Sequence, residues 1–156
     1  PAALPFHAEA MQSSYRRTLT LAGTVTTIEF GVVSMGNPHA VIIVGDLDKT
    51  AVKDVGEALQ QHPDFPKSVN VGFMQILSRD HIRLRVYERG AGETMACGTG
   101  ACAATVSGCL RGLLGDTVKV DLRGGSLQIN WAFSESRESS VLMTGPATTV
   151  YEGTIE

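Results

Sequence analysis

Cys97 stands in a glycine-rich segment, GAGETMACGTGACAA, which runs from Gly90 to Ala104. A helix that begins at Gly98 would place Cys97 at its N-terminus, where unpaired backbone N–H groups and the helix dipole favour a negative charge. We therefore expect a reactive thiol with a lowered pKa. Gly98, Thr99 and Gly100 also leave room for an anionic ligand to approach the same N–H groups. The alternative is a buried, unreactive cysteine in a glycine-rich turn.

Polar side chains in three other segments could take part in binding or proton transfer. Asn37 and His39 lie on a proline-containing turn, MGNPHA, and Asn70 lies inside the strand-like segment SVNVGF. Glu88 and Arg89 end another strand, directly before the glycine-rich segment. Each also has a structural interpretation, as a turn or hairpin residue, a satisfied histidine or a solvated ion pair. Taken singly, none of them identifies a site.

The cysteine spacing argues against disulfides and against a zinc site. The three cysteines, at positions 97, 102 and 109, are crowded into one segment, where they could not join distant parts of the chain. Their C-x4-C-x6-C spacing matches no zinc motif, and no histidine lies close to them in the sequence. We expect no bound metal and a reduced, cytoplasmic setting.

The composition is that of one globular domain covering residues 1–156. Apolar residues make up 43% of the 156 residues and charged residues 19%, which is far from the composition of a disordered chain. The net charge of −3 gives no basic surface for nucleic acid or for an acidic membrane, so we expect neither as a partner. The first ten residues lack a secretory signal pattern, and no apolar run is long enough to cross a bilayer.

Apolar patterning predicts a chain rich in strands. Two strands hinged near Gly23 are expected within residues 16–33, a continuous apolar strand near residues 40–44, and an amphipathic surface helix over residues 48–62. Hairpins are expected over residues 69–88 and 117–133, followed by two short terminal strands broken at Gly145 and Pro146.

The segment Gly98–Leu114 is the exception, because it has helical length and carries one charge, Arg111. A helix that is apolar on all sides has no face for water and must be buried. Strands precede and follow it. We therefore expect an α+β domain in which a curved, mostly antiparallel, barrel-like sheet wraps around one central helix.

Several segments together resemble one known family. GVVSMGNPHAV, NVGFMQI, HIRLRVYERGAGETMACGTGACAA and MTGPATTVYEG are similar to the C-terminal half of diaminopimelate epimerases. The resemblance covers most of the chain, and the combination of GNPH with ERGAGET and ACGTGACA is highly specific. It implies one of two pseudo-symmetric domains of a cofactor-free enzyme that inverts one α-carbon of diaminopimelate with two acid/base groups.

The resemblance also implies roles for individual residues. Cys97 would be one acid/base group, and His39 and Glu88 would lie near the reacting thiols and tune their protonation. Backbone N–H groups of Gly98 and Thr99 would hold the α-carboxylate. The distal amino-acid group of the substrate would be held by Asn37, Asn70, Glu88 and Arg89.

The expected second catalytic cysteine belongs to the family's N-terminal half, which this sequence lacks. Cys102 and Cys109 would lie further along the central helix and could not face Cys97 across a substrate. The chain alone is therefore expected to be inactive, with the N-terminal domain as its partner. The resemblance further implies a homodimer with Tyr151 in the subunit contact.

The sequence leaves three alternative functions open. A proline or hydroxyproline racemase and a phenazine-type isomerase share a similar fold, but ERGAGETMACGTG is not expected in them. A cysteine hydrolase could use Cys97 and His39, although no third orienting group is evident. A binding or regulatory module could keep the amino-acid pocket without catalysis.

Overall fold

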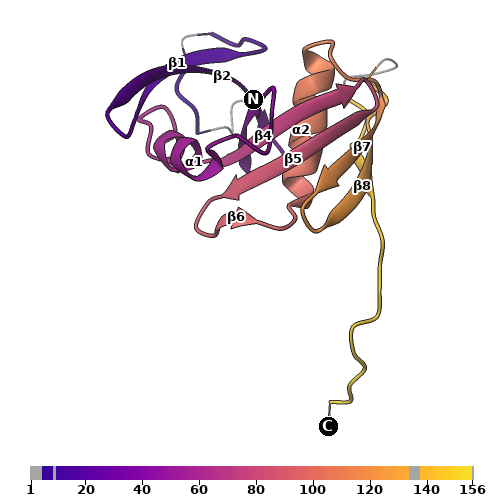
Figure 1. The fold of residues 1–156 in the computed structure, drawn as a ribbon. Coiled ribbons are helices and arrows are strands. Elements are labelled where there is room, and N and C mark those ends of the chain that lie inside the picture. The colour runs from indigo at the N-terminus through magenta and orange to yellow at the C-terminus, as the bar shows by residue number, and fades with distance from the viewer. Residues whose placement is uncertain (1–4, 9, 134–137, 156) are drawn as a thin grey trace.

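The computed structural model describes residues 5–8, 10–133 and 138–155, and these form one curved mixed sheet with two helices (Figure 1). The strand order is β1-β2-β3-β4-β5-β7-β8-β9, and β6 pairs with β5 beside this path. The elements are β1 (Tyr15–Leu21), β2 (Thr24–Ser34), β3 (Pro38–Ile43), α1 (Val52–Gln60), β4 (Asn70–Ser78), β5 (His81–Glu88), β6 (Gly92–Thr94), α2 (Gly98–Leu110), β7 (Thr117–Leu122), β8 (Gly125–Asn130) and β9 (Leu142–Thr144).

Helix α2 is the central helix that the apolar run predicts. It packs against β2, β3, β4, β5 and β8, and nearly all of its residues from Gly100 to Cys109 are buried. Around it lies a core that includes Met74, Ile82, Val120 and Ile129. The α+β architecture with a sheet curved around one apolar helix is thus confirmed.

Helix α1 lies away from α2 and covers a second apolar core beside the β1–β2 hairpin (Figure 1). It connects β3 to β4, which are parallel, and a second parallel pair joins β5 to β7. All other strand pairs are antiparallel among the described residues. The hairpin patterns in the sequence do not predict these two parallel pairs, because each pair needs a crossover connection between its strands.

Several elements differ from the predictions. Helix α1, at Val52–Gln60, is shorter at both ends than the helix predicted over residues 48–62. Helix α2 begins at Gly98 as predicted but ends at Leu110, because Gly112 adopts a φ of 71° and its N–H bonds to the carbonyl of Cys109. The prediction of a second terminal strand after Gly145 is wrong. Residues 146–155 are exposed and belong to no strand, and they run away from the domain (Figure 1). A strand needs a neighbour to accept its hydrogen bonds, and β9 already occupies the edge of β8.

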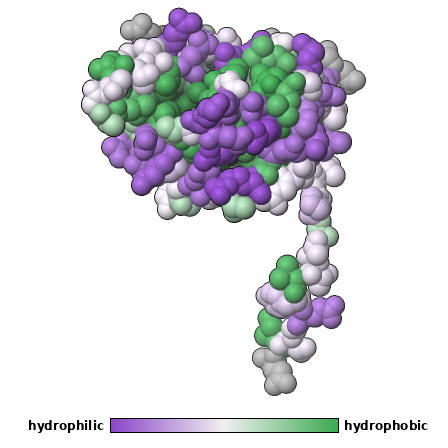
Figure 2. Space-filling view, in the orientation of Figure 1, coloured by the Kyte–Doolittle hydropathy of each residue, from purple (hydrophilic) through white to green (hydrophobic). Residues whose placement is uncertain are grey.

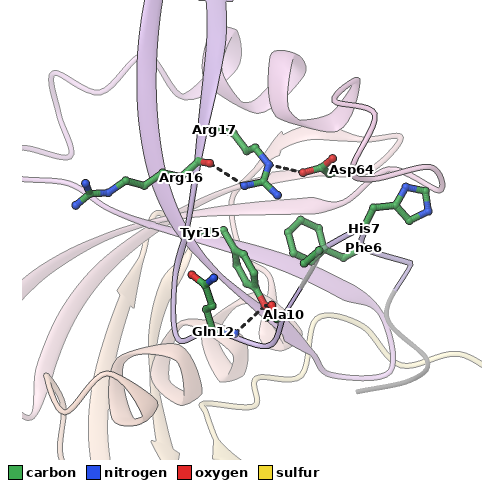
Figure 3. Close-up of a pocket in the computed structure, with 9 residues that line it drawn as sticks. Phe6, His7, Ala10, Gln12, Tyr15, Arg16, Arg17 and Asp64 are labelled. Carbon is green, nitrogen blue, oxygen red and sulfur yellow. Dashed lines mark hydrogen bonds and ion pairs between the residues drawn. The ribbon is translucent and has the colours of Figure 1, made fainter.

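The N-terminal segment packs onto β1 and borders a cavity of about 700 Å³ (Figure 3). The Tyr15 hydroxyl accepts a hydrogen bond from the N–H of Gln12 at 3.0 Å and donates to the carbonyl of Ala10 at 3.2 Å. Arg17 forms an ion pair with Asp64. None of the residues that line this cavity is a candidate site residue, so the cavity lies apart from the chemistry predicted around Cys97. In the part of the chain that the structure describes, no helix is long and apolar enough to cross a membrane.

Candidate active site

Strand ends bring the predicted polar residues to one edge of the sheet. In the parallel pair β3–β4, His39 lies directly opposite Asn70, so the amino ends of both strands meet there. Strand β5 runs antiparallel to β4, with Tyr87 opposite Val71, so its carboxyl end brings Glu88 to the same edge. The short hairpin from β5 to β6 then leads directly to the N-terminus of α2. Segments around residues 37–39, 70 and 88–89 thereby converge on Cys97.

Cys97 is the N-cap residue of α2, with φ −145° and ψ 104°, and only 6% of its surface is exposed. Its thiol donates a hydrogen bond to Oε2 of Glu88 at 3.2 Å. The Thr99 hydroxyl lies 3.6 Å from Sγ. The hydroxyl of Thr94 donates to the other carboxylate oxygen of Glu88, Oε1. The thiol therefore stands between a carboxylate, a hydroxyl and the first turn of a helix.

The expectation of a lowered Cys97 pKa is wrong. Burial raises the pKa of this thiol, and the neighbouring Glu88 carboxylate raises it further. The Thr99 hydroxyl and the N–H of Gly100 act in the opposite direction, but the thiol makes no capping hydrogen bond of normal geometry. Desolvation of a thiolate and a like charge beside it thus outweigh the hydrogen bonds that lower the pKa. Cys97 rests as a neutral thiol whose proton is directed at Glu88.

Asn37 links the β2–β3 turn to the first turn of α2. Its Oδ1 lies 3.0 Å from Nε2 of His39, and its Nδ2 lies 3.5 Å from the Thr99 hydroxyl. Because an amide oxygen only accepts, Nε2 of His39 carries the proton in this contact. His39 thus bonds to Asn37, whereas the side chain that contacts Cys97 from the strand edge is Glu88. The geometry does not form the Cys97–His39 pair that a cysteine hydrolase would need.

His39 is held in its neutral form. It is 1% exposed, and burial lowers its pKa from 6.5 to about 4, although the Glu88 carboxylate opposes this shift. At neutral pH the imidazole therefore carries no charge. Its contribution to the site is a fixed dipole and a hydrogen bond to Asn37.

Asn70 and Arg89 are joined to each other and to the backbone. The buried Asn70 amide donates to the carbonyl of Pro38 at 3.3 Å and accepts from the backbone N–H of Arg89 at 2.9 Å. The exposed Arg89 guanidinium bonds to the carbonyl of Lys67 at 2.9 Å. Asn70 therefore connects the start of β3 to the end of β5, which fixes the edge of the sheet from which Glu88 and Arg89 emerge.

Cys102 and Cys109 lie further along α2 than Cys97, and Tyr151 lies beyond β9. Cys109 is buried in the core and donates to the carbonyl of Gly115 at 3.2 Å, and Cys102 is half-buried on α2. Tyr151 is 86% exposed on the terminal segment beyond β9. Thr94 is the residue of the cluster that sequence reasoning missed. A threonine in a strand is common, and the one available signal was its place in the ERGAGET segment, three residues before Cys97.

The chain matches one family of known proteins over most of its length. Residues 31–150 match the family "Diaminopimelate epimerase", and this range contains every residue of the cluster described above. The chain belongs to the diaminopimelate epimerase family. Two curated diaminopimelate epimerases, from Thioalkalivibrio sulfidiphilus and Nitrosomonas eutropha, are 56% and 54% identical to the whole chain. The chain spans about half of their length, 54% in each case.

Solved structures support the diaminopimelate epimerase fold at lower identity. A hydroxyproline epimerase from Agrobacterium vitis is 21% identical, with a TM-score of 0.52 over 75% of this chain and 41% of its own. A phenazine biosynthesis protein from Enterococcus faecalis is 16% identical, with a TM-score of 0.50 over 76% of this chain and 39% of its own. These likenesses concern the fold alone. The proline or hydroxyproline racemase and the phenazine-type isomerase therefore share the architecture, whereas the sequence relationship lies with the diaminopimelate epimerases.

Proposed function

We propose that this chain supplies one of the two acid/base groups of a cofactor-independent diaminopimelate epimerase, with Cys97 as that group. The observation that carries the proposal is the contact between the Cys97 thiol and Glu88 Oε2, 3.2 Å apart at the N-terminus of α2. Burial and the neighbouring carboxylate keep this thiol protonated, so that it can donate a proton to a substrate carbanion. Family membership supports diaminopimelate as the substrate.

The chemistry needs a strong local field. The α-proton of an amino acid is very weakly acidic, so its removal requires stabilisation of the carbanion charge that spreads into the α-carboxylate. The first N–H groups of α2, at Gly98 and Thr99, suit a carboxylate at this position, because the first N–H groups of a helix have no partner within it and lie at the positive end of the helix dipole. The exposed Thr99 hydroxyl adds a further donor.

Because Cys97 is neutral at rest, it acts as the acid in one direction of the reaction. A thiolate from the other half of the enzyme removes the α-proton on one face, so that a C–H bond breaks and an S–H bond forms. Cys97 then gives its own proton to the carbanion on the opposite face and becomes the thiolate. In the reverse direction, Cys97 is the base. The Thr99 hydroxyl and the N–H of Gly100 stabilise that thiolate, since both lower the pKa of Cys97.

The polar groups of the sheet edge are suited to the distal amino-acid group of the substrate. Arg89 is exposed, and its planar guanidinium matches a carboxylate. Each Glu88 oxygen accepts one hydrogen bond in this structure and keeps a second lone pair for an ammonium group. Asn37 and Asn70 complete this set of donors and acceptors. His39, neutral and bonded to Asn37, holds Asn37 in place.

The curated relatives are about twice as long as this chain. On this proposal, the part that they have in addition supplies the second acid/base group and the rest of the pocket. The proposal further includes a homodimer with Tyr151 in the subunit contact and a cytoplasmic location, in keeping with amino-acid biosynthesis. It also predicts that the 156-residue chain alone does not epimerise diaminopimelate, because inversion needs a donor on the face opposite Cys97.

The test uses the protein made from the complete coding sequence, compared with the 156-residue chain. We expect the complete protein to interconvert LL- and meso-diaminopimelate and to leave proline and hydroxyproline unchanged. Cys97→Ala should abolish the reaction. Cys102→Ala, which changes a half-buried cysteine of the same helix, is the matched control and should retain it.

Other outcomes identify the alternatives. Turnover of proline or hydroxyproline in preference to diaminopimelate would assign a racemase of the related fold. Binding of diaminopimelate without loss of an α-tritium label to water would assign a binding module. Turnover by the 156-residue chain alone, abolished by Cys97→Ala, would contradict the requirement for a second half.

A further inference from the structure

Thr94 and Glu88 lie on the same face of the β5–β6 hairpin as the N-terminus of α2. In this hairpin Val86 lies opposite Thr94, and Glu88 lies opposite Gly92. Side chains at alternate positions share a face, so Val86, Glu88 and Thr94 point to one side. That side faces α2, because a Cβ added at Gly100 would lie 3.0 Å from Val86 and 3.1 Å from the sulfur of Cys97.

The opposite face of the hairpin is occupied by a separate ion pair. Arg85 bonds to both carboxylate oxygens of Glu93, at 2.7 and 2.9 Å. Glu93 is thus engaged away from the thiol, and Glu88 is the acidic side chain of this hairpin that reaches Cys97. Figure 2 shows hydrophilic side chains gathered over the middle of the face that the sheet turns to the viewer, as expected for the side of the sheet remote from α2.

We propose that Thr94 is a positioning residue, which holds the Glu88 carboxylate against the Cys97 thiol. Its hydroxyl has one hydrogen. That hydrogen is given to Oε1 of Glu88, because the other acceptor, the carbonyl of Ala96, lies at the longer distance of 3.4 Å. With Oε1 fixed in this way, Oε2 is directed at Sγ, 3.2 Å away.

The two residues that bond to the Glu88 carboxylate, Thr94 and Cys97, are close in the sequence. Thr94 ends β6 and Cys97 precedes α2. The hydroxyl that fixes the Glu88 carboxylate and the thiol that donates to it therefore lie three residues apart in the sequence. Glu88 is half-buried, so without the hydroxyl its carboxylate is free to turn toward water. The thiol would then lose both its acceptor and the like charge that raises its pKa. Thr94 thus acts on Cys97 only through Glu88.

The catalytic consequence rests on the proposed function, but the test of the contact itself does not. The pKa of Cys97 is measured in the 156-residue chain from the pH dependence of its ¹³Cβ resonance, assigned with Cys97→Ser. The amide spectrum reports the fold at each pH. Thr94→Val should lower the Cys97 pKa by about 0.5 unit or more, toward the value in Glu88→Gln. Thr94→Ser should retain the wild-type value, and Thr18→Val on the exposed side of β1 is the matched control.

The double variant Thr94→Val/Glu88→Gln separates positioning from a general structural effect. We expect it to give the same Cys97 pKa as Glu88→Gln alone, because the threonine has nothing left to position. Should Thr94→Val fail to fold, Thr94→Ala removes the same hydroxyl. An unchanged or raised pKa in Thr94→Val, no effect of Glu88→Gln, or an equal shift in both backgrounds would each overturn the proposal.

In the complete protein, Thr94→Val should reduce kcat more than it raises KM and should move the pH profile of kcat, with Thr94→Ser restoring both. A merely structural role would leave that profile in place. If the complete protein does not epimerise diaminopimelate, the proposed function fails, whereas the measured pKa shifts still decide the role of Thr94.

Discussion

His39 and Asn70 lie directly opposite each other on the parallel strands β3 and β4, although 30 residues and helix α1 separate them in the chain. This register places the turn that carries Asn37 beside the segment that carries Asn70. Asn70 in turn holds the backbone of Arg89. The cluster around Cys97 therefore depends on one strand pairing and on one buried amide.

The first prediction concerns that amide. Asn70→Ala removes the hydrogen bonds to the carbonyl of Pro38 and to the N–H of Arg89 and leaves a buried carbonyl without its partner. We expect the free energy of unfolding in urea to fall by about 2 kcal/mol. Asn130→Ala, which removes an exposed hydrogen bond to Thr117, is the matched control and should cost less than about 1 kcal/mol. Equal losses in the two variants would show that Asn70 does not fix the sheet edge.

Alanine substitutions at two glycines in the first turn of α2 should have opposite effects on the stability of the protein. A Cβ at Gly98 would meet the flexible end of Met143 at 3.0 Å, which can move aside. A Cβ at Gly100 would meet Val86 and the sulfur of Cys97, both buried, at 3.0 and 3.1 Å. Alanine favours a helix over glycine by up to about 1 kcal/mol, so Gly98→Ala should keep or raise stability.

Gly100→Ala should instead lower stability by about 1–3 kcal/mol through overpacking. Urea unfolding of both variants checks the pair. If Gly100→Ala proves as stable as Gly98→Ala, the thiol does not lie against the helix as described.

Much of the fold follows from the sequence because its signals are local. Alternation in HIRLRVYE predicts a half-buried strand, and the uncharged run after Gly98 can only be a buried helix. The pairing of β3 with β4 could not be predicted in this way, since it depends on where α1 packs. The pKa of Cys97 was predicted with the wrong sign for the same reason. The helix dipole is visible in the sequence, whereas the burial of the thiol and the approach of Glu88 result from tertiary packing.

The site residues differ in how far the sequence could identify them. Family resemblance singled out Asn37, His39, Asn70 and Arg89, and the structure brings them to one edge. Thr94 carries no such signal in itself, because its hydroxyl matters only through a contact with Glu88 that the hairpin register creates.

A pH-dependent loss of stability is predicted from His39. Its pKa is lowered from 6.5 to about 4 in the folded protein, so between these values the unfolded chain binds a proton that the folded chain does not. Stability therefore falls as the pH decreases through this window, by about 3 kcal/mol in all. His39→Gln should flatten the slope of unfolding free energy against pH between about 6.5 and 4. Parallel slopes in the two proteins would mean that His39 is protonated in the folded state.

The exposed terminal segment is expected to make the chain associate with a second copy of itself. Val150, Tyr151 and Ile155 are 90%, 86% and 98% exposed on a segment without a strand partner, and Figure 2 shows apolar atoms open to solvent along it. Exposed apolar groups on unpaired backbone favour contact with a second chain. We expect light scattering over a concentration series to show dimers that Tyr151→Ala weakens. Met11→Ala, at an exposed position far from this segment in the sequence, is the control. A monomer at all concentrations would contradict a subunit contact at Tyr151.

On the proposed mechanism, Cys97 exchanges a proton with the α-carbon of diaminopimelate. The most direct measurement follows the complete protein and its Cys97→Ala variant in ²H₂O, with mass spectrometry and stereochemical analysis of the product. We expect the wild-type protein to yield inverted product carrying one deuterium at the inverted α-carbon, and Cys97→Ala to yield none while remaining folded. Inverted, deuterated product formed by Cys97→Ala at the wild-type rate would show that another group carries the proton.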